Sequence, residues 1–107
     1  MVGAIFESYV VSEIIKSYWH NGKRPKIYYY RDKNKQEIDV LLEENGQLYP
    51  IEIKSRSNPD RNCIRHFHVI EDVLEVEKGE GAVICMADQW SQIPLTKNDY
   101  IVPVGYI

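Results

Sequence analysis

Two carboxylates and a lysine, Asp39, Glu52 and Lys54, occur at spacings that could support metal chemistry. The dipeptide Asn45-Gly46 lies between two apolar runs, which is the strongest short signal for a β-hairpin. A two-residue loop at this dipeptide places Asp39 directly opposite Glu52. Side chains opposed in this way have Cβ atoms roughly 5 Å apart, and two like charges there repel each other. A hard divalent cation would offset that repulsion, because carboxylate oxygens are its preferred ligands.

Lys54 follows Glu52 by two residues, so both side chains are expected on one face of a hairpin over residues 36–54. An ammonium group there could stabilise an attacking hydroxide or a phosphate oxygen. The alternative is an ordinary solvated face, on which Glu37 and Lys54 form a surface ion pair of little energetic weight. The other face is expected to be fully apolar, and a one-residue shift of the pairing would spoil both faces. The expected apolar pairs are Val40–Ile51, Ile38–Ile53 and Leu42–Tyr49.

The spacing of apolar residues predicts the elements around this hairpin. A helix is expected over residues 2–20, and Asn21-Gly22 ends it because glycine supplies the left-handed cap. Residues 26–31 and 82–87 are typical of strands, residues 63–78 favour a second helix, and residues 100–107 offer an optional last strand. The predicted order is α-β-β-β-α-β, with a parallel crossover beside the hairpin. The apolar stripe expected on the first helix is Ile5, Phe6, Tyr9, Val10, Ile14 and Tyr18.

Length and composition indicate one soluble globular domain over residues 1–107. Apolar residues make up 44% and charged residues 27%, which excludes a disordered chain. The net charge of −3 argues against general coating of nucleic acid, which needs an excess of basic residues. The two cysteines, Cys63 and Cys85, lack metal-type spacing and are expected to be reduced thiols in a cytoplasmic protein. The sequence shows neither a signal peptide nor an apolar stretch long enough to span a membrane.

The amino-acid sequence around these acids resembles known protein families. Asp39, followed by Glu52-Ile53-Lys54 across a hairpin and preceded by a helix bearing Glu7, resembles the PD-(D/E)xK nuclease superfamily, whose core order is also αβββαβ. More narrowly, GAIFESYVVSEIIKSY, YYRDKNKQEIDVLL and LYPIEIKS resemble the C-terminal domain of unknown function of prokaryotic P-loop ATPases. The resemblance covers nearly the whole chain. It implies an α/β, restriction-endonuclease-like fold with a mixed central sheet flanked by helices.

The same resemblance implies roles for particular residues. Asp39 and Glu52 would be the metal-ligating acids, with the backbone carbonyl of Ile53 as a further ligand. Lys54 would be the catalytic lysine, and Glu7 would support the metal or its water shell. The implied cofactor is Mg²⁺ or Mn²⁺, and the implied chemistry is hydrolysis of a phosphodiester. No G-x-x-x-x-G-K-[ST] motif occurs, so this chain is expected to be the C-terminal fragment of a longer ATPase.

Basic residues on both sides of the hairpin suggest contacts with nucleic acid. Residues 20–35 hold six Lys or Arg against one Asp, interleaved with three tyrosines that could stack bases. The alternative for that segment is a solvated loop beside an ordinary strand. A zinc site at His66 and His68 is not expected, because residues two apart on a helix do not share a face. The expected phosphate contacts are Lys33, Lys35, Arg56, Arg61 and Arg65, with plain surface charge as the alternative for the arginines.

The leading hypothesis from the sequence is a metal-dependent phosphodiester hydrolase that acts on nucleic acid. The rival is a catalytically inactive nuclease-fold module that binds nucleic acid or a protein partner as an accessory domain of an ATPase. The sequence leaves open whether the domain is an active enzyme, and fold analogy alone does not decide it.

Overall fold

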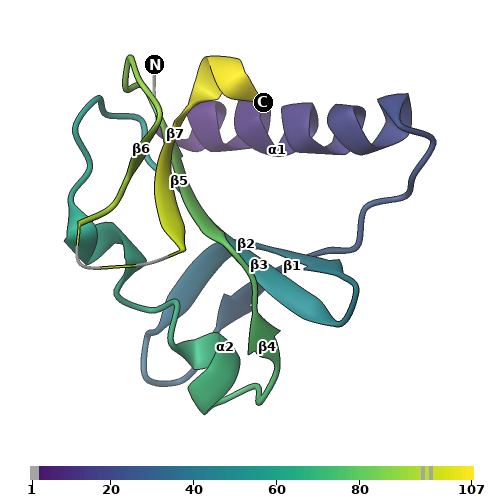
Figure 1. Cartoon of the computed structure of the whole chain (residues 1–107), viewed down its shortest axis with the longest axis vertical. Helices are drawn as coiled ribbons and strands as arrows, with labels where there is room; N and C mark the ends of the chain where they lie inside the picture. The colour runs from purple at the N-terminus through teal and green to yellow at the C-terminus, as the bar shows by residue number, and fades with distance from the viewer. Residues whose placement is uncertain (1–2, 95, 97) are drawn as a thin grey trace.

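The computed structural model describes residues 3–94, 96 and 98–107, and these form a mixed sheet flanked by helical segments (Figure 1). This arrangement confirms the α/β class expected from the sequence. The described strands follow the order β1-β2-β3-β5-β7-β6, with the short β4 beside β3. The strands are β1 (Ile27–Arg31), β2 (Glu37–Glu44), β3 (Gln47–Ile53), β4 (Glu77–Lys78), β5 (Gly81–Cys85), β6 (Ser91–Gln92) and β7 (Asp99–Pro103).

Helix α1 (Gly3–His20) covers one face of the sheet (Figure 1). Its buried side chains pack against β2, β3, β5 and β7. The helix ends where expected: Gly22 has φ +70°, and Lys23 N–H donates to Tyr18 C=O at 2.9 Å, a Schellman cap. The stripe is narrower than predicted, because Ile5 and Tyr9 are 61% and 48% exposed. The buried residues of α1 are Phe6, Val10 and Ile14.

The β2–β3 hairpin has the predicted turn, and the predicted pairing holds from the turn as far as Val40–Ile51, so the expected Ile38–Ile53 pair does not form. Asn45 and Gly46 both have positive φ, 53° and 79°, as a two-residue primed turn requires. Cross-strand pairs run from Glu44–Gln47 to Val40–Ile51 in the expected register. The antiparallel pairing of β2 with β3 is therefore determined by this local signal.

A β-bulge in β2 overturns the prediction that Ile38 shares a face with Val40. Tyr28 pairs with Leu41 and Tyr30 pairs with Ile38, so two residues of β2, Asp39 and Val40, oppose one residue of β1. The extra residue turns Ile38 to the opposite face from Val40. Ile38 packs with Leu41 and Leu48 there, while Val40 packs under α1. Both faces of the hairpin are thus partly apolar, and the bulge lies at the candidate site.

The prediction of a helix over residues 63–78 is wrong. The chain instead forms a short 3₁₀ helix, η1 (Arg61–Ile64), a turn, and a single-turn helix, α2 (Val69–Asp72). β-Branched residues disfavour a long helix in this segment, and Glu75 adopts φ +56°, outside helical geometry. The broken path lets Cys63, Phe67 and Ile70 pack over the face of the sheet opposite α1.

The crossover after the hairpin is parallel, as predicted. β3 pairs with β5 and β5 pairs with β7, both in parallel. The parallel pairing with β3 is interrupted between β4 and β5, at residues 79–80, which lie next to Tyr49 and Pro50 of β3. Because proline has no N–H to donate, the loss of pairing at this point costs nothing on the β3 side. After β7, the short 3₁₀ helix η2 (Val104–Tyr106) turns back toward α1 (Figure 1).

A buried ion pair links β4 to β7. Lys78 Nζ lies 2.8 Å from Asp99 Oδ1, both side chains are almost fully buried, and the ammonium also lies 5.8 Å from the centre of the Phe67 ring. Gly81 allows this arrangement, because a Cβ there would lie 2.7 Å from the Phe67 ring. Cys63 and Cys85 are buried free thiols. Among the described residues, no helix has the length and apolar character needed to cross a membrane.

Candidate metal and phosphate site

The predicted acids and lysine line one small cavity. It has a volume of about 100 Å³, well below the roughly 300–1,000 Å³ of pockets for drug-sized ligands, so it suits an ion with its waters. It lies between the start of β2, the end of β3 and the η1–α2 segment. Its lining residues are Lys35, Glu37, Asp39, Glu52, Lys54, Cys63, Arg65 and His66.

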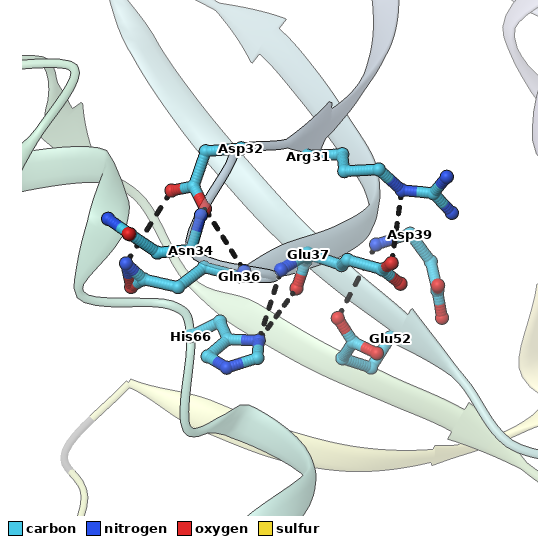
Figure 2. A network of polar contacts seen from close by, with 8 residues as sticks. All are labelled: Arg31, Asp32, Asn34, Gln36, Glu37, Asp39, Glu52 and His66. Atoms are coloured by element: carbon cyan, nitrogen blue, oxygen red, sulfur yellow. Dashed lines mark hydrogen bonds and ion pairs between the residues drawn. The ribbon is translucent and has the colours of Figure 1, made fainter.

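Asp39 and Glu52 meet where the backbone ladder between β2 and β3 stops. The paired residues end at Val40–Ile51. Beyond that pair, Asp39 N–H donates to Glu52 Oε1 at 3.4 Å (Figure 2). Ile53 N–H donates to Asp39 Oδ2 at 2.9 Å. Each carboxylate therefore replaces a backbone carbonyl as acceptor. Asp39 and Glu52 are therefore close together, as expected, but they are not a cross-strand backbone pair. Hydrogen bonds from backbone N–H groups to the two carboxylates take the place of that pairing.

The electrostatics of this pair are unfavourable without a cation. Glu52 is only 7% exposed. Burial, followed by the nearby Asp39 charge, raises the pKa of Glu52 to about 8, and Lys54 opposes part of that rise. This raised pKa favours the protonated form of Glu52 near neutral pH. A group with this behaviour in a cavity is a candidate functional group.

Glu7 approaches the site from α1 without lining its cavity. Burial raises the pKa of the Glu7 carboxyl, with a further contribution from Asp39, while Lys54 lowers it. The Glu7 carboxyl is therefore close enough to the site for the charges of Asp39 and Lys54 to affect its pKa. Its role as a supporting acid stays a prediction.

A polar network fixes the strand that carries Asp39 (Figure 2). His66 Nδ1 lies 3.1 Å from the Glu37 backbone N and 3.2 Å from the Glu37 backbone O. The Glu37 carboxylate pairs with Arg31 at 3.0 Å. These contacts hold the start of β2 between β1 and the η1–α2 segment, which keeps the bulge in place.

The loop before β2 is held by one aspartate. Asp32 Oδ1 accepts the backbone N–H groups of Asn34 and Gln36, and Tyr30 O–H donates to Asp32 Oδ2 at 2.8 Å. These hydrogen bonds, that from Tyr30 first, lower the pKa of Asp32. The closed loop brings Lys35, which has φ +62°, to the cavity.

The predicted phosphate contacts separate into two groups. Lys35 and Arg65 line the cavity, and Arg65 also borders a wider cavity of about 450 Å³ together with Arg61. Arg56 instead donates to Cys63 Sγ at 3.0 Å. Lys33 is exposed and lies outside the lining of the acid cavity.

His66 and Cys63 are lining residues that the sequence did not indicate as part of this site. His66 contacts Glu37, which is 29 positions away. The motif CIRHFH predicted a regular helix, and only its broken path turns His66 toward the start of β2. No spacing rule in the sequence could have found that contact.

The donor set fits a small hard cation. Mg²⁺ commonly uses one or two carboxylates and keeps several waters or substrate oxygens as its other ligands. Asp39 and Glu52 supply the carboxylates, and the Ile53 peptide is beside them through its N–H bond to Asp39. Within the described residues no group of three or more His, Cys, Asp or Glu side chains is arranged to hold a metal ion. The site therefore offers a two-carboxylate set and no closed protein cage.

A family model described as "Domain of unknown function (DUF4143)" matches residues 2–107. No curated protein and no solved structure matches the chain.

Proposed function

We propose that this chain, which belongs to the DUF4143 family of domains of unknown function, is a Mg²⁺- or Mn²⁺-dependent phosphodiester hydrolase acting on nucleic acid. The observation that carries the proposal is the position of Asp39 and Glu52 at the end of the β2–β3 ladder, with Lys54 in the same cavity. Two acids held this close, one with its pKa raised to about 8, are a poor arrangement for stability alone.

Each residue has a role that follows from its place. Asp39 and Glu52, with the Ile53 carbonyl, would hold the ion. When bound, that ion would polarise a phosphate and lower the pKa of a water. Lys54 places a positive charge beside the acids, where it stabilises negative charge that develops on the phosphate. Lys35 and Arg65 lie on the same cavity and bind phosphate oxygens at its rim.

The resemblance to the PD-(D/E)xK superfamily supports the same conclusion. In this chain α1, the antiparallel strands β1–β3, the single-turn α2 and the parallel strand β5 come in a succession compatible with the order αβββαβ, with the short β4 added before β5. We further propose that the domain is the C-terminal part of a prokaryotic, cytoplasmic P-loop ATPase. Its ATPase domain would then be the first partner of this site.

Calorimetric titration of the chain with Mn²⁺ tests the proposal. We expect one binding event that is lost in the variant carrying Asp39→Asn and Glu52→Gln. A variant with Glu71→Gln and Glu80→Gln, two exposed acids outside the cavity, is the matched control for lost charge and should bind as the wild type does. A nuclease assay on single- and double-stranded DNA and RNA follows, with and without Mn²⁺. Cleavage that persists in the site variant would refute the proposal.

One observation favours the rival function, an inactive module that binds nucleic acid or a protein. Both acids already accept backbone N–H groups and so have a structural use. Under this alternative, the chain binds its partner, but Mn²⁺ gives no heat that depends on Asp39 and Glu52. The same titration therefore separates the two functions.

A further inference from the structure

The surface next to the site combines exposed tyrosines with unpaired basic residues. Tyr28, Tyr29 and Tyr30 border a hollow of about 470 Å³ whose floor includes Leu41 and Leu48. We infer that this surface binds an unpaired strand of nucleic acid, with Tyr29 as the ring on which a base stacks. The inference rests on the proposed function, because it names the form of substrate that enters the cavity.

Tyr29 is the most available of the three rings. It is 77% exposed. Tyr28 and Tyr30 use their hydroxyl groups to donate to Glu43 and Asp32, which holds those two rings in place. Tyr29 lies on β1 opposite the bulge that contains Asp39, and neighbouring strands are about 4.8 Å apart. A base stacked on Tyr29 would therefore place its strand beside the acid cavity.

Cations lie at both ends of β1. Arg24 and Lys26 precede the strand, and Lys33 and Lys35 follow it. None of these four makes an ion pair within the described residues, whereas Lys23 and Arg31 pair with Glu44 and Glu37. Lys35 also lines the acid cavity, so the basic surface is continuous with the proposed active site. Free cations around exposed rings match a flexible chain of phosphates and bases.

An unpaired strand fits better than a duplex or a protein strand. Stacking on a tyrosine requires a free base face, and a duplex hides those faces in its own stack. β1 lies at one edge of the sheet, so it could also pair with a protein segment. Lysines and arginines on either side of an edge strand disfavour pairing with a protein strand, whereas they favour binding of a phosphate backbone.

The test measures binding of a fluorescently labelled oligothymidine to the full chain by anisotropy. EDTA is present, so binding is measured without metal chemistry. The same strand annealed to its complement is the comparison. We expect the single strand to bind at least about tenfold more tightly. Tyr29→Ala should weaken single-strand binding roughly 5- to 150-fold, the effect of losing one stacked base. Tyr29→Phe, which keeps the ring, should bind as the wild type does.

Two further variants sharpen the result. Trp90→Ala removes a ring that is 52% exposed near the opposite edge of the sheet, and it should leave binding unchanged. Arg24→Gln with Lys26→Gln should lower the slope of log K against log salt by about 1.4, near 0.7 for each lost phosphate contact. Equal binding of strand and duplex, an unaffected Tyr29→Ala variant, or no binding of either would overturn the inference. If neither nucleic acid binds, a protein strand that pairs with the β1 edge becomes the favoured ligand.

The inference and the proposed function can fail separately. Single-strand binding that depends on Tyr29, without cleavage in Mn²⁺, overturns the hydrolase proposal only. Cleavage of a duplex that is unaffected by Tyr29→Ala overturns this inference only.

Discussion

Asp39 supplies a missing backbone acceptor to Ile53: its Oδ2 takes the Ile53 N–H at 2.9 Å just beyond the last β2–β3 pair. The same carboxylate is a candidate metal ligand. Its two uses, in folding and in chemistry, can be separated by the choice of substitution.

Asp39→Asn and Asp39→Ala should differ in stability. Asparagine keeps an oxygen that can accept the Ile53 N–H, whereas alanine leaves that buried group unbonded, at a cost of about 1–3 kcal/mol in free energy of unfolding. Both variants should lose Mn²⁺ binding. Urea denaturation and calorimetry check the two effects. Equal stability of the two variants would show that the hydrogen bond has no energetic weight.

Folding stability without metal should fall as pH rises from about 5 to about 8. The pKa of Glu52 is about 8 in the folded chain, against an ordinary value of 4.5 for a glutamate. Between these values the folded state holds a proton that the unfolded state has released, so unfolding becomes more favourable by up to a few kcal/mol. Thermal melts across this range check the slope. Glu52→Gln, which mimics the protonated acid, should flatten it, and an unchanged slope would assign the effect to another group.

Binding of Mn²⁺ should release about one proton at pH 7. Glu52 must lose its proton to become a ligand, so the Mn²⁺ affinity should rise about tenfold per pH unit between pH 6 and pH 8. Calorimetry in two buffers with different protonation enthalpies measures the released proton. At pH 9 the release should vanish, which serves as an internal control. An affinity that is independent of pH would contradict the raised pKa of Glu52.

Lys54→Met should slow cleavage strongly while preserving the fold and the metal site. Lys54 is half-buried, and its side chain makes no ion pair within the described residues, so its removal breaks no salt bridge there. Losing a charge aimed at the phosphate should lower kcat by roughly 10²–10³-fold. Lys16→Met, on the surface of α1, is the matched control. Normal cleavage in the Lys54 variant would remove this residue from the mechanism.

Removing the lysine of the buried Lys78–Asp99 pair should lower the free energy of unfolding much more than removing the lysine of a surface pair. Lys78→Met leaves the Asp99 carboxylate buried without its cation, which should cost about 3–5 kcal/mol in free energy of unfolding. Lys16→Met breaks the exposed pair with Glu13 and should cost less than about 1 kcal/mol. Chemical denaturation measures both. Similar losses for the two variants would show that the buried pair is not a structural link.

Local signals in the sequence determined the hairpin, the first helix and the meeting of the two acids with Lys54. Asn45-Gly46 requires positive φ at both positions, and the alternation of β3 permits one register, so no distant contact is needed. Gly22 ends α1 for an equally local reason. The buried strand β5 also follows from a local pattern, the continuous apolar run that begins at Ala82.

Only the tertiary structure decided what surrounds the acids. The bulge depends on how β1 pairs with β2, and it moved Ile38 to the other face. The segment predicted as a helix over 63–78 packs across the sheet as short turns, which brings His66 and Cys63 to the cavity. Burial of Phe67 and Ile70 outweighs weak helix propensity there, and such long-range packing energy leaves no periodic trace in the sequence. The order of residues thus specified which groups could react, while packing between distant segments decided which of them share a cavity.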